Sequence, residues 1–211
     1  MLPLLFQNPL VFVAWVLAIL VALSVHEFSH ALVSNWLGDP TAKRLGRLTL
    51  NPAAHVDLLG LLALVTVGFG WGKPVPYNAY NLRNQKWGPI AIALAGPAMN
   101  LVLALGLGLL TRLLLPVLSD GNLLIQFLYL SLMLNLSLML FNLLPIPPLD
   151  GSKILLAVLS GPQAARTRIW LETRGPLLLI GVVIADAVLG LGIFGWLYRV
   201  VTALTDLIIG V

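Results

Sequence analysis

An apolar run over residues 10–37 carries His26, Glu27 and His30 in its last third. The run is long enough to cross a membrane as one helix, which takes about 20 apolar residues. Because helix positions four apart share a face, both imidazoles can reach one metal ion, with Glu27 one step round the helix. An uncompensated ionisable group inside such a run costs about 2.5–3.5 kcal/mol. This cost favours a metal site over a polar helix end at the membrane surface.

The composition indicates an integral membrane protein. Of the 211 residues, 59% are apolar and 9% are charged, whereas a soluble domain carries about 25% charged residues. Cysteine is absent, which excludes disulfides, thiolate metal ligands and a cysteine nucleophile. The net charge of +4 comes from Lys and Arg between apolar runs, so it indicates membrane orientation and not nucleic-acid binding. The N-terminus has no basic segment and no small-residue cleavage site, so we expect the first apolar run to be retained.

The apolar runs and their breaks predict an all-α polytopic membrane protein with about five membrane helices. After the first run, further spans are expected within residues 87–118 and over 123–144. Residues 175–210 are expected to form a C-terminal helical hairpin. The whole chain, 1–211, is expected to be one domain with its core in 10–154.

Residues 56–70 are expected to form a short re-entrant or interfacial segment near the cytoplasmic face. The segment is apolar, but as a helix it is only about 22 Å long, against a hydrocarbon core of about 30 Å. Pro74 and Pro76 follow it, and prolines forbid a helix there and suit an extended edge.

The basic residues predict the orientation in the membrane, because loops rich in Lys and Arg stay in the cytoplasm. If residues 56–70 do not cross, the N-terminus lies outside and two basic groups lie inside. His26, His30 and Asp150 then lie toward the cytoplasmic ends of their segments, where they can meet. The two groups are Lys43, Arg44, Arg47, Lys73, Arg83 and Lys86, and Lys153, Arg166, Arg168 and Arg174.

A catalytic zinc usually has three protein ligands and a water, so two histidines leave one ligand to be found. Asp150 is favoured, because it follows a proline-broken segment and precedes Gly151, so its carboxylate can turn inward from non-helical backbone. Its alternative role is the N-cap of the helix that follows. Glu172 stays open as a ligand, although an Arg in its basic loop is the simpler partner. The remaining candidates are His55, Asp57, Asp186 and Asp206.

Five motifs follow one another along the chain: His26-Glu-Phe-Ser-His30, Asn51-Pro52 with His55 and Asp57, Gly72-Lys-Pro-Val-Pro76, Ala95-Gly-Pro97, and Asn142 through Gly151. In this order they resemble the site-2 proteases, which are intramembrane zinc metallopeptidases. The resemblance implies that His26, His30 and Asp150 bind one zinc ion per chain. It also implies that Glu27 is catalytic and that Asn142 assists at the substrate. The likeness is to a minimal subgroup without an inserted PDZ domain, a nucleotide-binding module or a preceding transmembrane helix.

The expected function is therefore hydrolysis of peptide bonds in the transmembrane segments of other proteins, within the lipid bilayer. Zinc would activate a water, and Glu27 would act as the general base. The Asn142 amide would donate to the oxyanion or the substrate backbone, or else to a neighbouring helix. The segment with Pro74 and Pro76 would pair with the unwound substrate as an added strand.

Two functions of other classes stay open on the sequence alone. A small multipass metal-ion transporter also uses intramembrane His and Asp with broken helices, but usually has an internal repeat, which this sequence lacks. A non-catalytic membrane metal-binding protein would not need Glu27. Serine proteolysis in the membrane is not supported, because no G-x-S-x-G motif is present.

Overall fold

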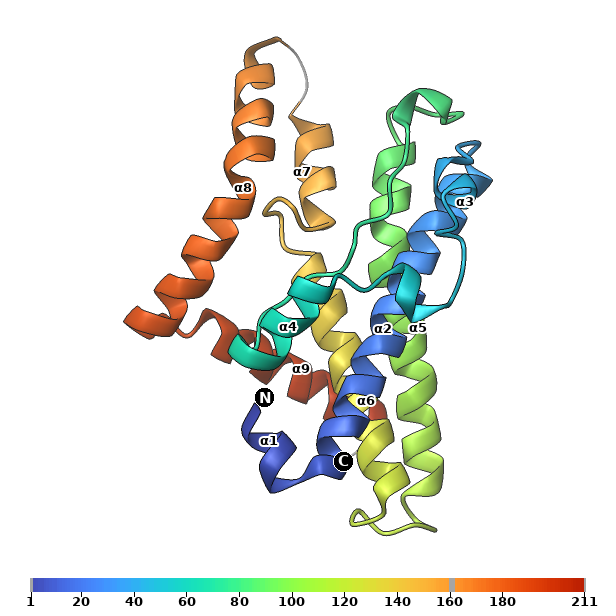
Figure 1. Cartoon of the computed structure of the whole chain (residues 1–211), viewed down its shortest axis with the longest axis vertical. Coiled ribbons are helices and arrows are strands. Elements are labelled where there is room, and N and C mark those ends of the chain that lie inside the picture. The colour runs from blue at the N-terminus through green and yellow to red at the C-terminus, as the bar shows by residue number, and fades with distance from the viewer. Residues whose placement is uncertain (1, 160–161, 211) are drawn as a thin grey trace.

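The computed structural model describes residues 2–159 and 162–210, and within them every regular element is helical. Figure 1 shows a bundle of long, nearly parallel helices, with shorter helices at one end and a bent pair beside it. The α-helices are α1 (Leu2–Gln7), α2 (Pro9–Trp36), α3 (Thr41–Arg44), α4 (Leu58–Val67), α5 (Gly88–Leu114), α6 (Leu123–Asn142), α7 (Gly151–Val158), α8 (Pro162–Leu189) and α9 (Ile193–Ile209). Two short 3₁₀ turns, η1 (Pro52–Ala54) and η2 (Ala79–Asn81), lie in the loops.

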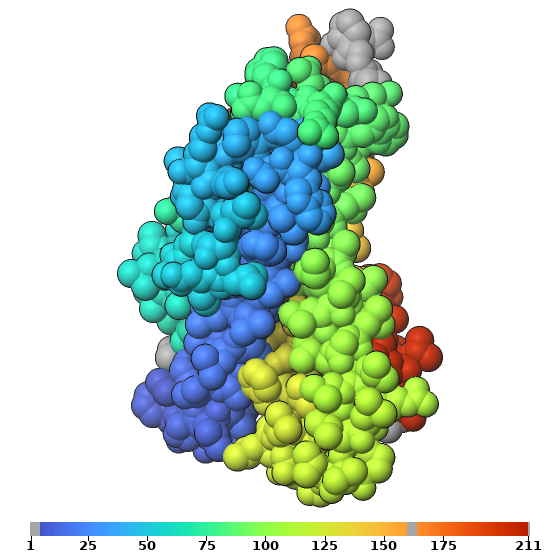
Figure 2. Space-filling view, turned by 90° about the vertical axis from the view of Figure 1, so that its right-hand side faces the viewer, coloured from blue at the N-terminus to red at the C-terminus, as the bar shows by residue number. Residues whose placement is uncertain are grey.

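The bundle consists of α2, α5 and α6, which lie side by side (Figure 1). Each is long and apolar enough to cross a membrane, at 28, 27 and 20 residues. Figure 2 shows α2 and α5 meeting along one face of the molecule, with α6 visible between their lower halves. The buried core is built mainly from α5, α6 and α9, through Ala104, Leu132, Leu136, Met139, Val201 and Ile209.

The C-terminal helices change the predicted count of spans. Residues 164–189 of α8 and helix α9 meet at 93°. Only when taken together are they long and apolar enough to cross a membrane. Gly190 and Gly192 make the bend, with φ of 63° and 78°, a region that glycine adopts without strain. The structure therefore has three candidate spans, or up to four, and the predicted count of about five is not confirmed. The helical hairpin expected over residues 175–210 corresponds to this bent pair.

Helix α4 leaves the bundle and the chain returns to its starting point. The Asp57 side chain caps α4 by accepting a hydrogen bond from the Gly60 amide at 2.9 Å, and Gly68 ends the helix with φ 82°. Gly72 then pairs with Val56 as an isolated antiparallel bridge. The entry and exit of this segment thus lie next to each other.

The loop after α2 is joined to the segment before α5 by one buried carboxylate. Asp39 accepts hydrogen bonds from the Thr41 hydroxyl at 2.6 Å, the Asn78 amide at 2.7 Å and the Asn81 side chain at 2.8 Å. Residues 73–78, predicted as an extended edge, have no regular structure. The connections at this end of the bundle therefore form one polar unit around Asp39.

Candidate metal centre

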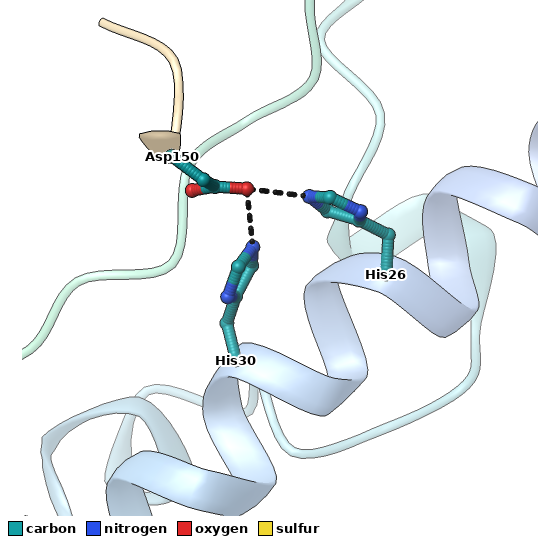
Figure 3. A group of neighbouring side chains, drawn as sticks. All are labelled: His26, His30 and Asp150. Carbon is teal, nitrogen blue, oxygen red and sulfur yellow. Dashed lines mark hydrogen bonds and ion pairs between the residues drawn. The ribbon is translucent and has the colours of Figure 1, made fainter. Parts of the chain in front are cut away.

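His26, His30 and Asp150 lie together in the structure (Figure 3). One possible ligand atom from each lies within 4.8 Å of the others. Asp150 Oδ2 is 3.1 Å from His26 Nε2 and 3.3 Å from His30 Nε2. The two imidazoles come from successive turns of α2, as the spacing predicts, and both are buried.

Asp150 reaches the histidines from the irregular segment between α6 and α7. That segment holds Pro145, Pro147 and Pro148, which end the helix because proline has no amide donor and clashes with the preceding turn. Directly after Asp150, a Cβ atom on Gly151 would be 2.1 Å from the Leu143 carbonyl oxygen, so only glycine fits this close return. The Asp150 side chain makes no capping bond to α7. Its carboxylate points at both imidazoles instead, as Figure 3 shows.

Helix α5 contacts the other nitrogen of each ring. His26 Nδ1 is 2.5 Å from Asn100 Oδ1, and His30 Nδ1 is 2.6 Å from the Ile92 carbonyl oxygen. A carbonyl oxygen only accepts hydrogen bonds, so each Nδ1 is the donor. A neutral imidazole with its proton on Nδ1 has a lone pair on Nε2. Both histidines therefore direct a lone pair toward the Asp150 carboxylate.

This arrangement fits a metal ion. Two lone pairs and a carboxylate oxygen that face one another repel, and a cation between them turns the repulsion into coordination. Two imidazole nitrogens and one carboxylate oxygen are a usual donor set for catalytic zinc, with a fourth position left for water. No fourth His, Asp or Glu joins this group within the part of the chain that the structure describes.

Glu27 follows His26 on α2 and is also buried, at 9% exposed. Arg47 is also buried, and its charge interacts with that of Glu27. Burial lowers the pKa of the Arg47 guanidinium below its usual value, and the charge of Glu27 offsets part of this shift. The same guanidinium donates a hydrogen bond to the Lys73 carbonyl. Arg47 therefore links the segment after α4 to the neighbourhood of Glu27, a role that its place in a basic group does not predict.

The other predicted site residues make contacts of their own. The Asn142 amide donates to the Leu138 carbonyl one turn earlier in α6, at 3.0 Å. His55 is fully buried, with Nε2 2.7 Å from the Thr49 carbonyl oxygen. Asp186 accepts from the Ile193 amide at 2.7 Å, at the bend between α8 and α9. Within the described residues, the metal group includes none of the other candidates for a third ligand, which are His55, Asp57, Glu172, Asp186 and Asp206.

The sequence interpretation gives no role at the centre to Asn100, Asn135 or Gly96, although Gly96 belongs to the Ala95-Gly-Pro97 motif. Asn100 contacts His26, and its amide donates to Asn135 Oδ1 at 2.8 Å. A Cβ atom on Gly96 would be 2.5 Å from His30 Nε2, so this glycine leaves the space beside both rings. The signal for Asn100 and Asn135 is present in the sequence, because polar residues inside apolar spans mark functional sites. Gly96 stands in the Ala95-Gly-Pro97 motif, but that motif alone does not assign it to the histidines.

The comparisons with known proteins agree with a metal site. The model of peptidase family M50 matches residues 117–185. A protein named "Putative zinc metalloprotease YwhC" in Bacillus subtilis is 42% identical over 147 residues, which cover 66% of this chain and 66% of that protein. "Putative zinc metalloprotease Rip2" is 36% identical over 152 residues in Mycolicibacterium smegmatis and 37% over 151 residues in Mycobacterium tuberculosis H37Rv. Both alignments cover 67% of this chain.

The chain spans only part of these relatives, 66% of YwhC and 55% of each Rip2. No solved structure matches it.

Proposed function

We propose that this chain, which belongs to peptidase family M50, is an intramembrane zinc metalloprotease that hydrolyses peptide bonds in transmembrane segments. It is an integral membrane protein with several apolar helices. One observation carries the proposal: His26 and His30 direct their Nε2 atoms at one Asp150 oxygen, inside a bundle of apolar helices. Ionisable side chains at membrane depth cost free energy, so their presence in one cluster indicates a function.

In this proposal His26, His30 and Asp150 hold the ion. A zinc ion held there would supply a water with its pKa lowered to about 7 and would polarise the scissile carbonyl. Glu27, one residue after His26, takes the proton of the attacking water and passes it to the leaving amine. Its burial within α2, directly after His26, supports this role.

Asn142 is proposed to assist at the substrate. Its side-chain amide has two N–H groups, and the bond to Leu138 uses one of them. The other N–H is available to donate to a substrate carbonyl. Asn142 is the last residue of α6, at the start of the segment that carries Asp150, which supports a place beside the centre.

Residues 56–70 are proposed to dip into the membrane without crossing it. The Val56–Gly72 bridge supports this proposal, because it joins the two ends of the segment. Helix α4 also exposes Leu58, Leu59, Leu62 and Val67, at 58–79% each, as expected for side chains that face lipid. After the bridge, the irregular segment with Pro74 and Pro76 is proposed to pair with an unwound substrate.

Both basic groups are proposed to face the cytoplasm, with the N-terminus outside. Helix α3, which carries Arg44, and the first half of α8, which carries Arg168, lie at the same end of the molecule (Figure 1). This end also carries the connection that contains Asp39. One cytoplasmic end with both basic groups agrees with the positive-inside rule.

The test compares the two glutamates, since the chain has only Glu27 and Glu172. Purified parent protein, Glu27→Gln and Glu172→Gln are assayed in the same detergent for bound zinc and for cleavage of one transmembrane peptide. We expect Glu27→Gln to keep its zinc and to lose cleavage by at least about 10²–10⁴, the contribution of a general base. Glu172 is exposed, so Glu172→Gln should match the parent. Cleavage by Glu27→Gln at the parent rate contradicts the mechanism, and zinc flux into liposomes without cleavage indicates a transporter.

A further inference from the structure

Helix α5 provides no metal ligand, yet three of its residues face the two histidines. Ile92, Gly96 and Asn100 are spaced by four, so they lie on one face over two turns. Ile92 contacts His30, Asn100 contacts His26, and Gly96 lies against both rings. The spacing on α5 thus matches the four-residue spacing of the histidines on α2.

Asn100 is held in turn by its neighbours in the bundle. Its amide nitrogen donates to Asn135 Oδ1 on α6 at 2.8 Å and to the Ala22 carbonyl on α2 at 3.2 Å. The Asn135 amide donates to the Ser131 carbonyl at 2.8 Å. Asn100 and Asn135 are 0% and 1% exposed, so water does not compete for these bonds.

The direction of each hydrogen bond that joins His26, Asn100 and Asn135 follows from two main-chain carbonyls. The Ser131 carbonyl can only accept, so the NH₂ group of Asn135 faces it and Asn135 Oδ1 faces Asn100. That oxygen and the Ala22 carbonyl both require the NH₂ group of Asn100. The Asn100 oxygen is then left to face His26 Nδ1.

We propose that Asn100, oriented by Asn135, is a positioning residue that fixes the tautomer of His26. With the proton held on Nδ1, the lone pair of His26 is on Nε2 and points at the metal. A reversed Asn100 amide would present N–H groups to Nδ1 and favour the tautomer that cannot bind through Nε2. The inference rests on the proposed function, because it assumes that His26 binds the metal.

The alternative is that the two asparagines only hold helices together, as interhelical amide bonds in membranes do. That role predicts loss of stability without a specific effect on the metal. The test therefore needs a readout that belongs to His26. The chain holds only three histidines, so nitrogen-15 labelling of histidine gives a spectrum with few signals, which His26→Ala assigns.

The first measurement is zinc affinity, by competition with a chelator, for the parent, Asn100→Leu, Asn100→Asp and Ser131→Ala. We expect Asn100→Leu to bind zinc about 10- to 100-fold more weakly, as for other partners of metal-bound histidines. Asn100→Asp should bind zinc more tightly than Asn100→Leu, because its carboxylate still accepts from Nδ1–H, but more weakly than the parent, because it no longer donates to Asn135 and Ala22. Ser131→Ala is the matched control, since the buried Ser131 hydroxyl has no partner within the described residues.

The second measurement is the nitrogen-15 spectrum of the metal-free parent and of metal-free Asn100→Leu, because zinc bound to Nε2 would itself fix the tautomer. We expect the proton of His26 on Nδ1 in the parent, and both tautomers in Asn100→Leu. A parent with the proton on Nε2, or parent-like zinc affinity in Asn100→Leu, overturns the inference. A parent that binds no zinc contradicts the proposed function instead. If Asn100→Leu does not fold, the parent spectrum decides the question.

Discussion

Gly96 on α5 and His30 on α2 approach so closely that a Cβ atom at position 96 would lie 2.5 Å from His30 Nε2. The same Cβ would be 2.6 Å from His26 Nε2. Contacts this short are well inside the sum of van der Waals radii, so the rings or the helix would have to move. The missing side chain of Gly96 is therefore part of the geometry of the centre.

We expect Gly96→Ala to weaken zinc binding and cleavage together, because the added methyl group displaces the Nε2 atoms from Asp150. Gly106→Ala is the matched control, since it lies on the same helix and a Cβ there meets nothing within 4 Å. It should keep zinc and raise stability slightly, by up to about 1 kcal/mol, because alanine favours a helix over glycine. Equal zinc affinity in the two variants contradicts the role given to Gly96.

Asp150→Ala should lose zinc and cleavage together, because only His26 and His30 would remain as ligands. The measurement is bound zinc per chain after dialysis, alongside the cleavage rate. Asp206→Asn serves as the control, since Asp206 is exposed on α9 and lies outside the group. Stoichiometric zinc in Asp150→Ala would show that another carboxylate is the third ligand.

Asn142→Ala should keep its zinc and cleave more slowly. An oxyanion donor contributes about 3–4 kcal/mol, so the loss in kcat is expected to be about 10²–10³. Its present bond lies within α6, so stability should change little. Unchanged kcat with a raised KM would indicate that Asn142 binds substrate equally in the ground and transition states. Unchanged values of both would remove Asn142 from the mechanism.

Asp39 should make stability depend on pH. Burial raises the pKa of Asp39, but hydrogen bonds from Asn81, Thr41 and Asn78 lower it by more than burial raises it. The net result is a pKa of about 2 in place of 3.8. A folded-state pKa below the unfolded value means that the carboxylate stabilises the fold above about pH 4, and that this contribution fades as the pH falls toward 2. The melting temperatures of the parent and Asp39→Asn should therefore converge between pH 5 and about 2. Asp120→Asn, at an exposed turn, should instead follow the parent throughout, and a constant gap for Asp39→Asn would contradict this account.

Cysteine labelling tests the orientation, and the chain has no cysteine of its own. Arg44→Cys and Arg168→Cys should both react with an impermeant reagent added from the cytoplasmic side. Ser119→Cys, in the turn between α5 and α6, should react only from the other side. Labelling of Arg44→Cys and Arg168→Cys from opposite sides would mean that residues 56–70 cross the membrane.

Part of the centre can be predicted from the sequence because its cause is local. The spacing of His26 and His30 on one helix places both on one face, and the prolines before Asp150 predict a break in α6. The structure brings these three side chains together, while their roles in binding and catalysis stay predictions. Local sequence patterns are sufficient for this much.

The contacts of α5 depend on how whole helices are rotated against each other. A membrane helix is apolar on most sides, so its pattern does not indicate which face meets α2. The sequence therefore does not place Ile92 or Gly96 beside the histidines, although Gly96 belongs to a motif. The predicted count of about five spans is not confirmed, for a related reason. Residues 176–190 and 193–209 are each apolar, but they meet in a bend at Gly190 and Gly192 and count together as at most one candidate span.

The separation of His26 and Asp150 by 124 positions along the chain has a consequence for biogenesis. A ribosome makes the two histidines first, inside the first long helix, and reaches Asp150 only after α5 and α6. Until then the nascent chain holds two of the three groups and has no complete centre. The centre is complete only when three inserted helices have come together. Other membrane segments that are inserted beside an unfinished copy of this chain therefore meet a protein that has no complete metal centre.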